Sequence, residues 1–309
     1  MRKPLKNEFS WSVSRHQLFT GCQRAYYYNH YGSWGGWEIN APERIRQTYI
    51  LKNIVSMPIW VGSIIHDLIQ KSLDSFANTG SFPTAEQLKE DALNTMRTGW
   101  TQSVKKEWIQ APKKTNLFEL YYGNGRNLPR EMTDKIKERV LECIDNFAHS
   151  QILKEILATP FLNWKPIDKL SFFMINDLKV WCAIDFAYTD QNGILHIIDW
   201  KTGSERKETL RFQLACYAIY AMEKWHAKLE SIEPHGVILN DGARVSNYTL
   251  SPNLIISAKD QILTSAQAMK AKLKDQENNM AEEDDFPCNP DEFQCAYCNF
   301  KEICPALNP

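Results

Sequence analysis

The sequence lacks several features that would assign it at once to a class of protein. No window approaches 18 uncharged apolar residues, so we expect no membrane-spanning helix. The opening stretch, MRKPLKNEFSWSVSR, has no apolar core of the secretory kind, which predicts that the chain carries no secretory signal and is cytoplasmic. There is no internal repeat and no GxxxxGK[ST] phosphate-binding loop, so no ATP-driven motor is indicated.

The charge is nearly balanced overall but unevenly distributed. The net charge is -1, and the chain is 43% hydrophobic and 24% charged, which is ordinary for a globular protein. Residues 275–292 carry eight acidic side chains and no Lys or Arg, so the remainder of the chain carries +7. We predict that the acidic stretch is a solvated linker. The basic remainder suits a surface that meets phosphates.

Cysteines are clustered near the end of the chain. The stretch QCAYCNFKEICP places Cys295, Cys298 and Cys304 as C-x2-C-x5-C. In a reducing compartment such a cluster more often binds metal than forms disulfides, but a closed site usually needs four ligands. Cys288 would complete a compact local site of the kind typical of zinc. Three further cysteines lie in apolar patterns and are predicted to be buried core thiols: Cys143, Cys182 and Cys216.

The apolar patterns predict helices first and a mixture of strands and helices afterwards. Helices are expected over residues 12–31, 59–76, 85–110, 130–157, 207–228 and 251–276. Strands are expected over residues 170–175, 180–189, 194–200, 235–240 and 244–250, the first three forming a β-meander. Residues 112–129 are predicted to be irregular, basic and aromatic. The order favours an α/β fold with a helical N-terminal region.

Polar residues interrupt the predicted strands at one place. Asp185 lies within VWCAIDFAYT, and HIIDWKTG carries Asp199 and Lys201 two residues apart, which places both on one strand face. A buried carboxylate is costly unless it is paired or bound to a cation. Two carboxylates and an ammonium at one spot suit a divalent metal and the charge that develops on phosphate. The alternative is an ordinary strand-end ion pair, with Asp185 in a turn.

The D-x13-D-x-K spacing across this hairpin resembles the core of the PD-(D/E)xK nuclease superfamily, and specifically its RecB-like branch. His66 in WVGSIIHDLIQ resembles the additional metal ligand of that branch, and QLACY matches its Q-x3-Y helix with Gln213 and Tyr217. Without the resemblance, the histidine reads as structural and the tyrosine as a buried residue of an amphipathic helix. The resemblance implies a restriction-endonuclease-like core, a central mixed β-sheet flanked by helices.

The same resemblance assigns roles to these residues. It implies that the side chains of His66, Asp185 and Asp199, with the backbone carbonyl of Trp200, hold Mg²⁺ or Mn²⁺. Lys201 would assist the attacking water. Gln213 and Tyr217 would position the DNA strand.

The N-terminal stretch SVSRHQLFTGCQRAYYYNHYG resembles the first helix of iron–sulfur RecB-like nucleases, which include the AddB nuclease domain and the CRISPR-adaptation exonucleases. The resemblance implies that Cys22, 273 residues before Cys295, joins the three C-terminal cysteines around a [4Fe–4S] cluster. Cys288 remains the rival fourth ligand. Arg24 is expected to help position DNA. Three tyrosines that follow it are expected either to contact nucleic acid or to pack in the core: Tyr26, Tyr27 and Tyr28.

The sequence therefore predicts one RecB-like nuclease domain over residues 1–309. Residues 1–164 form its mainly helical portion, 165–250 its catalytic α/β core, and 251–309 a C-terminal helix, the acidic linker and the iron–sulfur cysteines. The expected activity is metal-dependent hydrolysis of DNA by an exonuclease acting on ends or single strands, with an unidentified helicase or adaptation complex as a further partner. Two alternatives remain: a non-cutting DNA-binding or assembly subunit, and a zinc-binding adaptor.

Overall fold

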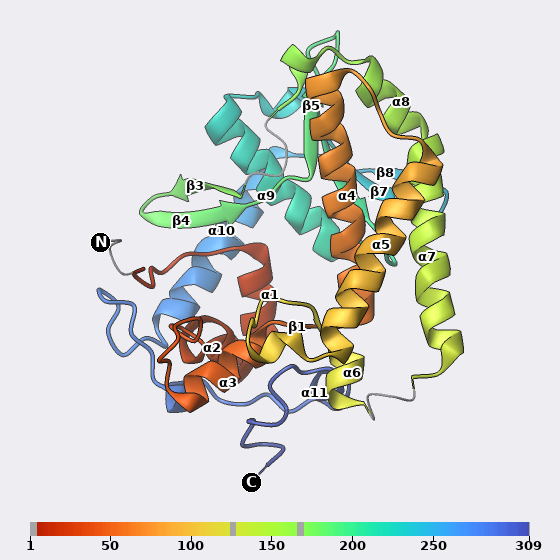
Figure 1. Ribbon diagram of the computed structural model, residues 1–309. Helices are drawn as coiled ribbons and strands as arrows, with labels where there is room; N and C mark the ends of the chain where they lie inside the picture. Colours follow the sequence, from red (N-terminus) through yellow and green to blue (C-terminus); the bar gives the residue numbers. More distant parts are fainter. Residues whose placement is uncertain (1–4, 124–127, 166–169, 309) are drawn as a thin grey trace.

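The computed structural model describes residues 5–123, 128–165 and 170–308 (Figure 1). The helices are α1 Val13–Gly21, α2 Gln23–Tyr27, α3 Glu43–Lys52, α4 Met57–Thr79, α5 Ala85–Val104, α6 Phe118–Tyr122, α7 Arg130–His149, α8 Gln151–Ala158, α9 Lys207–Trp225, α10 Pro252–Lys270 and α11 Glu292–Ala296. The strands are β1 Ile54–Val55, β2 Asn116–Leu117, β3 Ser171–Ile175, β4 Leu178–Cys182, β5 Phe186–Thr189, β6 Leu195–Lys201, β7 Ile232–Ile238 and β8 Arg244–Asn247. None of the described helices is long and apolar enough to cross a membrane.

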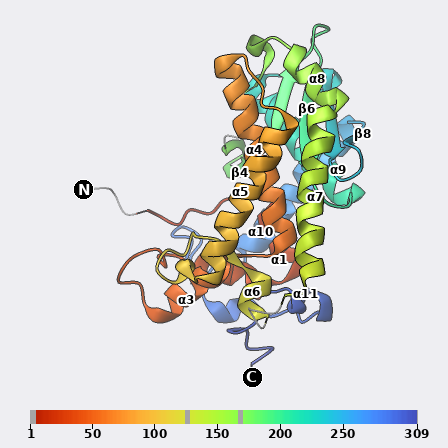
Figure 2. The same cartoon turned by 45° about the vertical axis from the view of Figure 1, so that its right-hand side comes forward.

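A four-stranded mixed sheet with the order β5-β6-β7-β8 lies at the centre. The β5–β6 and β7–β8 pairs are antiparallel, whereas β6 and β7 are parallel and are joined through α9. Successive residues of β6 point to opposite faces of the sheet and pack in different hydrophobic clusters. Ile197 packs in the cluster that includes α9 and α10, and Ile198 packs in the cluster that includes α4, α5 and α7. The prediction of an α/β fold with a central mixed sheet between helices is confirmed. Figure 2 shows α4, α5 and α7 standing together in front of the strands.

Helix α4 is positioned by its ends and by one glycine. It begins after Ser56 with Pro58 in its first turn, and it ends at Gly80, which adopts the left-handed conformation with φ +72°. A side-chain carbon at Gly62 would lie 3.3 Å from Thr202 Oγ1, just beyond the end of β6. The absence of that carbon therefore lets α4 pass close to the end of β6, one helical turn before His66.

The prediction of one strand over residues 180–189 was wrong. The segment forms two strands, β4 and β5, separated by residues 183–185. β4 pairs only with β3 in a two-stranded sheet and through a bridge from Trp11 to Val180, whereas β5 joins the central sheet. The three-strand meander is therefore absent from the described residues, and Asp185 lies in the break rather than on a strand.

Several predicted helices are shorter or interrupted. The helix expected over residues 12–31 breaks at Cys22, whose extended backbone (φ -154°) separates α1 from α2. The helix expected over 130–157 divides at Ser150, because the hydroxyl of Ser150 accepts a hydrogen bond from the Leu153 N–H and caps α8. The irregular stretch expected at 112–129 contains β2 and α6, and residues 124–127 lie outside the described residues.

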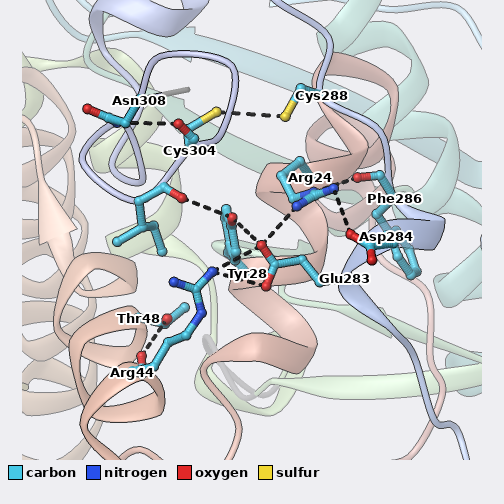
Figure 3. A network of polar contacts seen from close by, with 11 residues as sticks. Arg24, Tyr28, Arg44, Thr48, Glu283, Asp284, Phe286, Cys288, Cys304 and Asn308 are labelled. Atoms are coloured by element: carbon cyan, nitrogen blue, oxygen red, sulfur yellow. Dashed lines mark hydrogen bonds and ion pairs between the residues drawn. The ribbon is translucent and has the colours of Figure 1, made fainter.

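The acidic segment is not a solvated linker along its whole length. Glu283 Oε1 accepts hydrogen bonds from Arg24 Nη1 at 2.8 Å, from the Tyr28 hydroxyl at 2.6 Å and from Arg44 Nη2 at 3.1 Å (Figure 3). Phe286 is fully buried, and its carbonyl accepts a hydrogen bond from Arg24 Nε at 2.7 Å. The predicted linker is therefore fixed against α2 and α3, because its charge has buried partners there.

Candidate active site

The two aspartates and the lysine converge at the end of β6. Asp199 is 1% exposed and faces the α9 side of the sheet. Lys201, two residues later, places Nζ 2.6 Å from Asp199 Oδ2. Asp185 approaches from the break before β5, and its Oδ2 accepts a hydrogen bond from the Trp200 N–H at 2.8 Å. The side chain of Asp185 thus bonds the β6 backbone beyond the last β5–β6 pair, at Phe186 and Ile198.

Helix α9 supplies two polar side chains to the same point. Gln213 Nε2 donates to Asp199 Oδ1 at 3.0 Å, while Gln213 Oε1 accepts from Lys201 Nζ at 3.2 Å. The Tyr217 hydroxyl donates to Asp199 Oδ1 at 3.3 Å and accepts from Gln213 Nε2 at 2.6 Å. Because they are four residues apart, the two side chains share one helix face. Together they orient the carboxylate and the ammonium.

His66 of α4 completes the group from the opposite side. Its Nδ1 lies 3.4 Å from Asp185 Oδ1. Burial alone would lower the pKa of His66, but the charge of Asp185 outweighs burial and raises the pKa to about 9. Burial likewise favours a high pKa for Asp185, but the charge of His66 and the hydrogen bonds from His66 and the Trp200 N–H hold the pKa below its ordinary value. The pair is therefore ionised near neutral pH.

The pKa of Asp199 is raised, whereas that of Asp185 is lowered. Burial and the negative charge of Asp185 raise its pKa to about 6, although Lys201 opposes the shift. Asp199 Oδ2 is buried and, apart from the ion pair with Lys201, accepts no hydrogen bond from the described residues. Two neighbouring carboxylates with an incompletely satisfied buried oxygen favour a bound divalent cation. The donor set fits Mg²⁺ or Mn²⁺, since most of its ligand atoms are oxygens.

Comparison with known families agrees with this geometry. The family model of the PD-(D/E)XK nuclease superfamily matches residues 10–305. The chain belongs to this superfamily. Its members are nucleases that use divalent metal ions, so the protein is a nuclease-superfamily member whose expected substrate is DNA.

Other comparisons add little. A search of curated proteins found no match to the chain. A solved chain titled "Crystal structure of SSO0001" shares 16% identity, and the match covers 69% of this chain and 96% of that chain. The TM-score is 0.28, which is too low to indicate a shared fold.

Arg24 and two of the tyrosines that follow it are engaged elsewhere in this PD-(D/E)XK protein. The Arg24 side chain is largely buried and bonded to Glu283 and to the Phe286 carbonyl. Tyr26 and Tyr28 are also buried, which favours core packing over contact with nucleic acid. Arg24 is therefore not supported as a DNA-positioning residue, because its guanidinium already has buried partners. Tyr27 is half-buried and packs against Phe286.

Five cysteines line one cavity of about 290 Å³ between α1, α2 and the C-terminal segment: Cys22, Cys288, Cys295, Cys298 and Cys304. Cys288 and Cys304 place their sulfurs 3.8 Å apart. Among the described residues, however, no three thiols lie mutually within 4.8 Å. A tetrahedral zinc site needs sulfurs about 3.8 Å apart, from Zn–S bonds of about 2.3 Å. A [4Fe–4S] cluster would bind each thiolate to a different iron and so space the sulfurs more widely than zinc does.

The sequence did not reveal every polar group that the sheet brings together. His196, Glu233 and His235 place one ligand atom each within 4.8 Å of one another, on the sheet face opposite Asp199. The histidines are 39 residues apart, and only the β6–β7 register makes them neighbours. The sole sequence signal was polar residues at alternate positions of otherwise apolar strands.

Proposed function

We propose that the protein hydrolyses phosphodiester bonds of DNA at the Asp185–Asp199–Lys201 group with Mg²⁺ or Mn²⁺. The observation that supports this most strongly is the convergence of Asp199 and Lys201 with Asp185, from the strand break. The arrangement places two carboxylates and one ammonium on the same buried spot. A structural ion pair between Asp199 and Lys201 would not need the second carboxylate, Asp185, beside it.

The metal would be held by Asp185, Asp199 and His66, with the backbone carbonyl of Trp200. The Trp200 N–H already bonds to Asp185, and the carbonyl of a strand residue points to the same neighbour as its N–H. His66 would release its proton to act as a ligand. The bound ion would supply charge neutralisation at the reacting phosphate and a more acidic water.

The protein's own groups would position the reaction. Lys201 carries its ammonium beside Asp199, where it can orient the attacking water or stabilise negative charge on phosphate. Gln213 bridges these two side chains, and the buried Tyr217 supports Gln213. Their contacts favour a role in orienting the carboxylate and the lysine over direct contact with the DNA strand.

The substrate specificity follows from the resemblance to RecB-like exonucleases, which favours cutting from DNA ends or on single strands. The test compares labelled linear single-stranded DNA, linear duplex DNA and covalently closed circles of each, with Mn²⁺ and with EDTA. The proposal predicts Mn²⁺-dependent loss of linear DNA only. Cleavage of circles would replace the exonuclease with an endonuclease. Binding of all substrates without cleavage would indicate the non-cutting DNA-binding subunit.

We further propose that the cysteine cavity holds a [4Fe–4S] cluster through Cys22, Cys295, Cys298 and Cys304. Burial raises the pKa of Cys298 to about 11, and charges on Cys22, Cys304 and Cys295 add to the shift, which indicates that these four sulfurs share one environment. Cys288 lines the same cavity, with its sulfur 3.8 Å from that of Cys304, and is the rival fourth ligand. The cluster would tie α1 to the chain end and would take no part in hydrolysis.

A further inference from the structure

A second polar group lies on the other face of the central sheet. His196 of β6 stands directly beside Glu233 of β7, and His235 follows Glu233 on the same face. His196 Nδ1 lies 3.0 Å from His235 Nε2 and 3.8 Å from Glu233 Oε2. Since His196 and Asp199 are an odd number of residues apart on one strand, this group and the nuclease site face opposite sides.

The neighbours of each histidine fix which nitrogen is free. His235 Nδ1 lies 2.7 Å from Asn247 Oδ1, which can only accept, so Nδ1 carries the proton and Nε2 presents a lone pair. His196 Nε2 faces Asp190 Oδ2 at 3.7 Å, which favours a proton on Nε2 and a lone pair on Nδ1. Both lone pairs are then on atoms that lie, with one Glu233 carboxylate oxygen, within 4.8 Å of one another.

The separations suit a single transition-metal ion. A tetrahedral zinc site with bonds of about 2.0 Å has donor atoms about 3.3 Å apart, between the 3.0 Å and 3.8 Å found here. Two imidazoles and one carboxylate are ligands that zinc takes, while Asn247 and Asp190 are outer partners that orient ligating histidines. Tyr188 stacks on His196 with ring centroids 4.9 Å apart and restricts its rotation.

We propose that His196, Glu233 and His235 form a zinc-binding site that joins β6 to β7, with a solvent-facing fourth position beside the half-exposed Glu233. The site is separate from the nuclease centre and from the cysteine cavity. It uses nitrogen and oxygen donors, so it would select Zn²⁺ or Co²⁺ over Mg²⁺.

The test is titration of the purified protein with Zn²⁺ in excess Mg²⁺, using a chromophoric chelator as competitor, and in parallel with Co²⁺ followed by visible absorption. Wild type should bind one ion without a thiolate-to-cobalt band. His196→Gln should abolish that ion, and Glu233→Gln should weaken it at least tenfold. Asn247→Ala should weaken it by about 10- to 100-fold. His149→Gln, an exposed histidine of α7, is the matched control and should bind as wild type does.

Melting curves show whether each variant is folded. If His196→Gln does not fold, Glu233→Gln decides alone, because its side chain is half-exposed and its loss leaves the core intact. Equal zinc number and affinity in wild type and Glu233→Gln would overturn the proposal and leave a simple His196–His235 hydrogen bond. The same conclusion holds if every cobalt bound by wild type shows thiolate absorption.

Discussion

Asp185 Oδ2 accepts a hydrogen bond from the backbone N–H of Trp200 at 2.8 Å. This contact lies just beyond the last β5–β6 backbone pair. The Asp185 carboxylate therefore accepts the hydrogen bond that a backbone carbonyl would accept if β5 continued. It ties the candidate metal ligand Asp185 to the residue between Asp199 and Lys201. The break between β4 and β5 is therefore what places Asp185 in the site.

Removing the hydrogen bonds that Gln213 and Tyr217 of α9 donate to Asp199 should lower the cleavage rate more than the affinity for DNA. We expect Gln213→Ala and Tyr217→Phe to lower the rate of Mn²⁺-dependent cleavage by about 10- to 100-fold and to raise the Mn²⁺ concentration needed, because Asp199 loses partners that orient it. Rates measured across a Mn²⁺ series, with DNA affinity measured in parallel, check this. An unchanged Mn²⁺ requirement together with weaker DNA binding would instead favour direct DNA contact.

The cysteine cavity gives a ligand test. Cys22→Ser should lose iron and acid-labile sulfide and melt at a lower temperature, because it frees a constraint spanning nearly the entire chain, worth up to about 5 kcal/mol on chain-entropy grounds. Cys288→Ser, the matched control from the same cavity, should keep both iron and stability. Iron content, acid-labile sulfide and melting curves, all measured under nitrogen, show whether Cys22 or Cys288 is the fourth ligand. If Cys288→Ser lost its iron and Cys22→Ser kept it, the ligands would be the four C-terminal cysteines and Cys22 would not be one of them.

Glu283 should stabilise the C-terminal segment in a pH-dependent way. Burial opposes its ionisation, but hydrogen bonds from Tyr28 and Arg44 outweigh burial and hold its pKa below the ordinary 4.5. A carboxylate with a depressed folded-state pKa stabilises fully above the unfolded value, and this contribution is lost as pH falls through the folded value.

Glu283→Gln should therefore lower the free energy of unfolding by about 1.5–3 kcal/mol at pH 7. The difference from wild type should shrink below about pH 4.5. Urea unfolding at pH 7 and pH 4 measures both. A difference that is the same at the two pH values would show that the charge of Glu283 contributes nothing. Glu282→Gln, at an exposed neighbouring position, is the control.

The sequence predicted the parts of the site that depend on local spacing. Asp199 and Lys201 share a strand face because they are two residues apart, and Gln213 and Tyr217 share a helix face because they are four apart. The break at Asp185 was not predictable, since VWCAIDFAYT is apolar apart from Asp185 and Thr189, and periodicity cannot show which sheet each half joins. Partners far apart along the chain, such as Arg24 with Glu283, depend on tertiary packing, which no local pattern contains.

Mn²⁺-dependent cleavage of end-labelled DNA by purified wild type, Asp199→Asn and Lys201→Ala tests the central claim most directly. Asp177→Asn, an exposed aspartate in the β3–β4 turn, serves as the control. Wild type and Asp177→Asn should cut at equal rates, and each site variant should lose at least about 10²-fold in rate while still melting cooperatively. Cleavage by folded Asp199→Asn and Lys201→Ala at the wild-type rate would contradict the account.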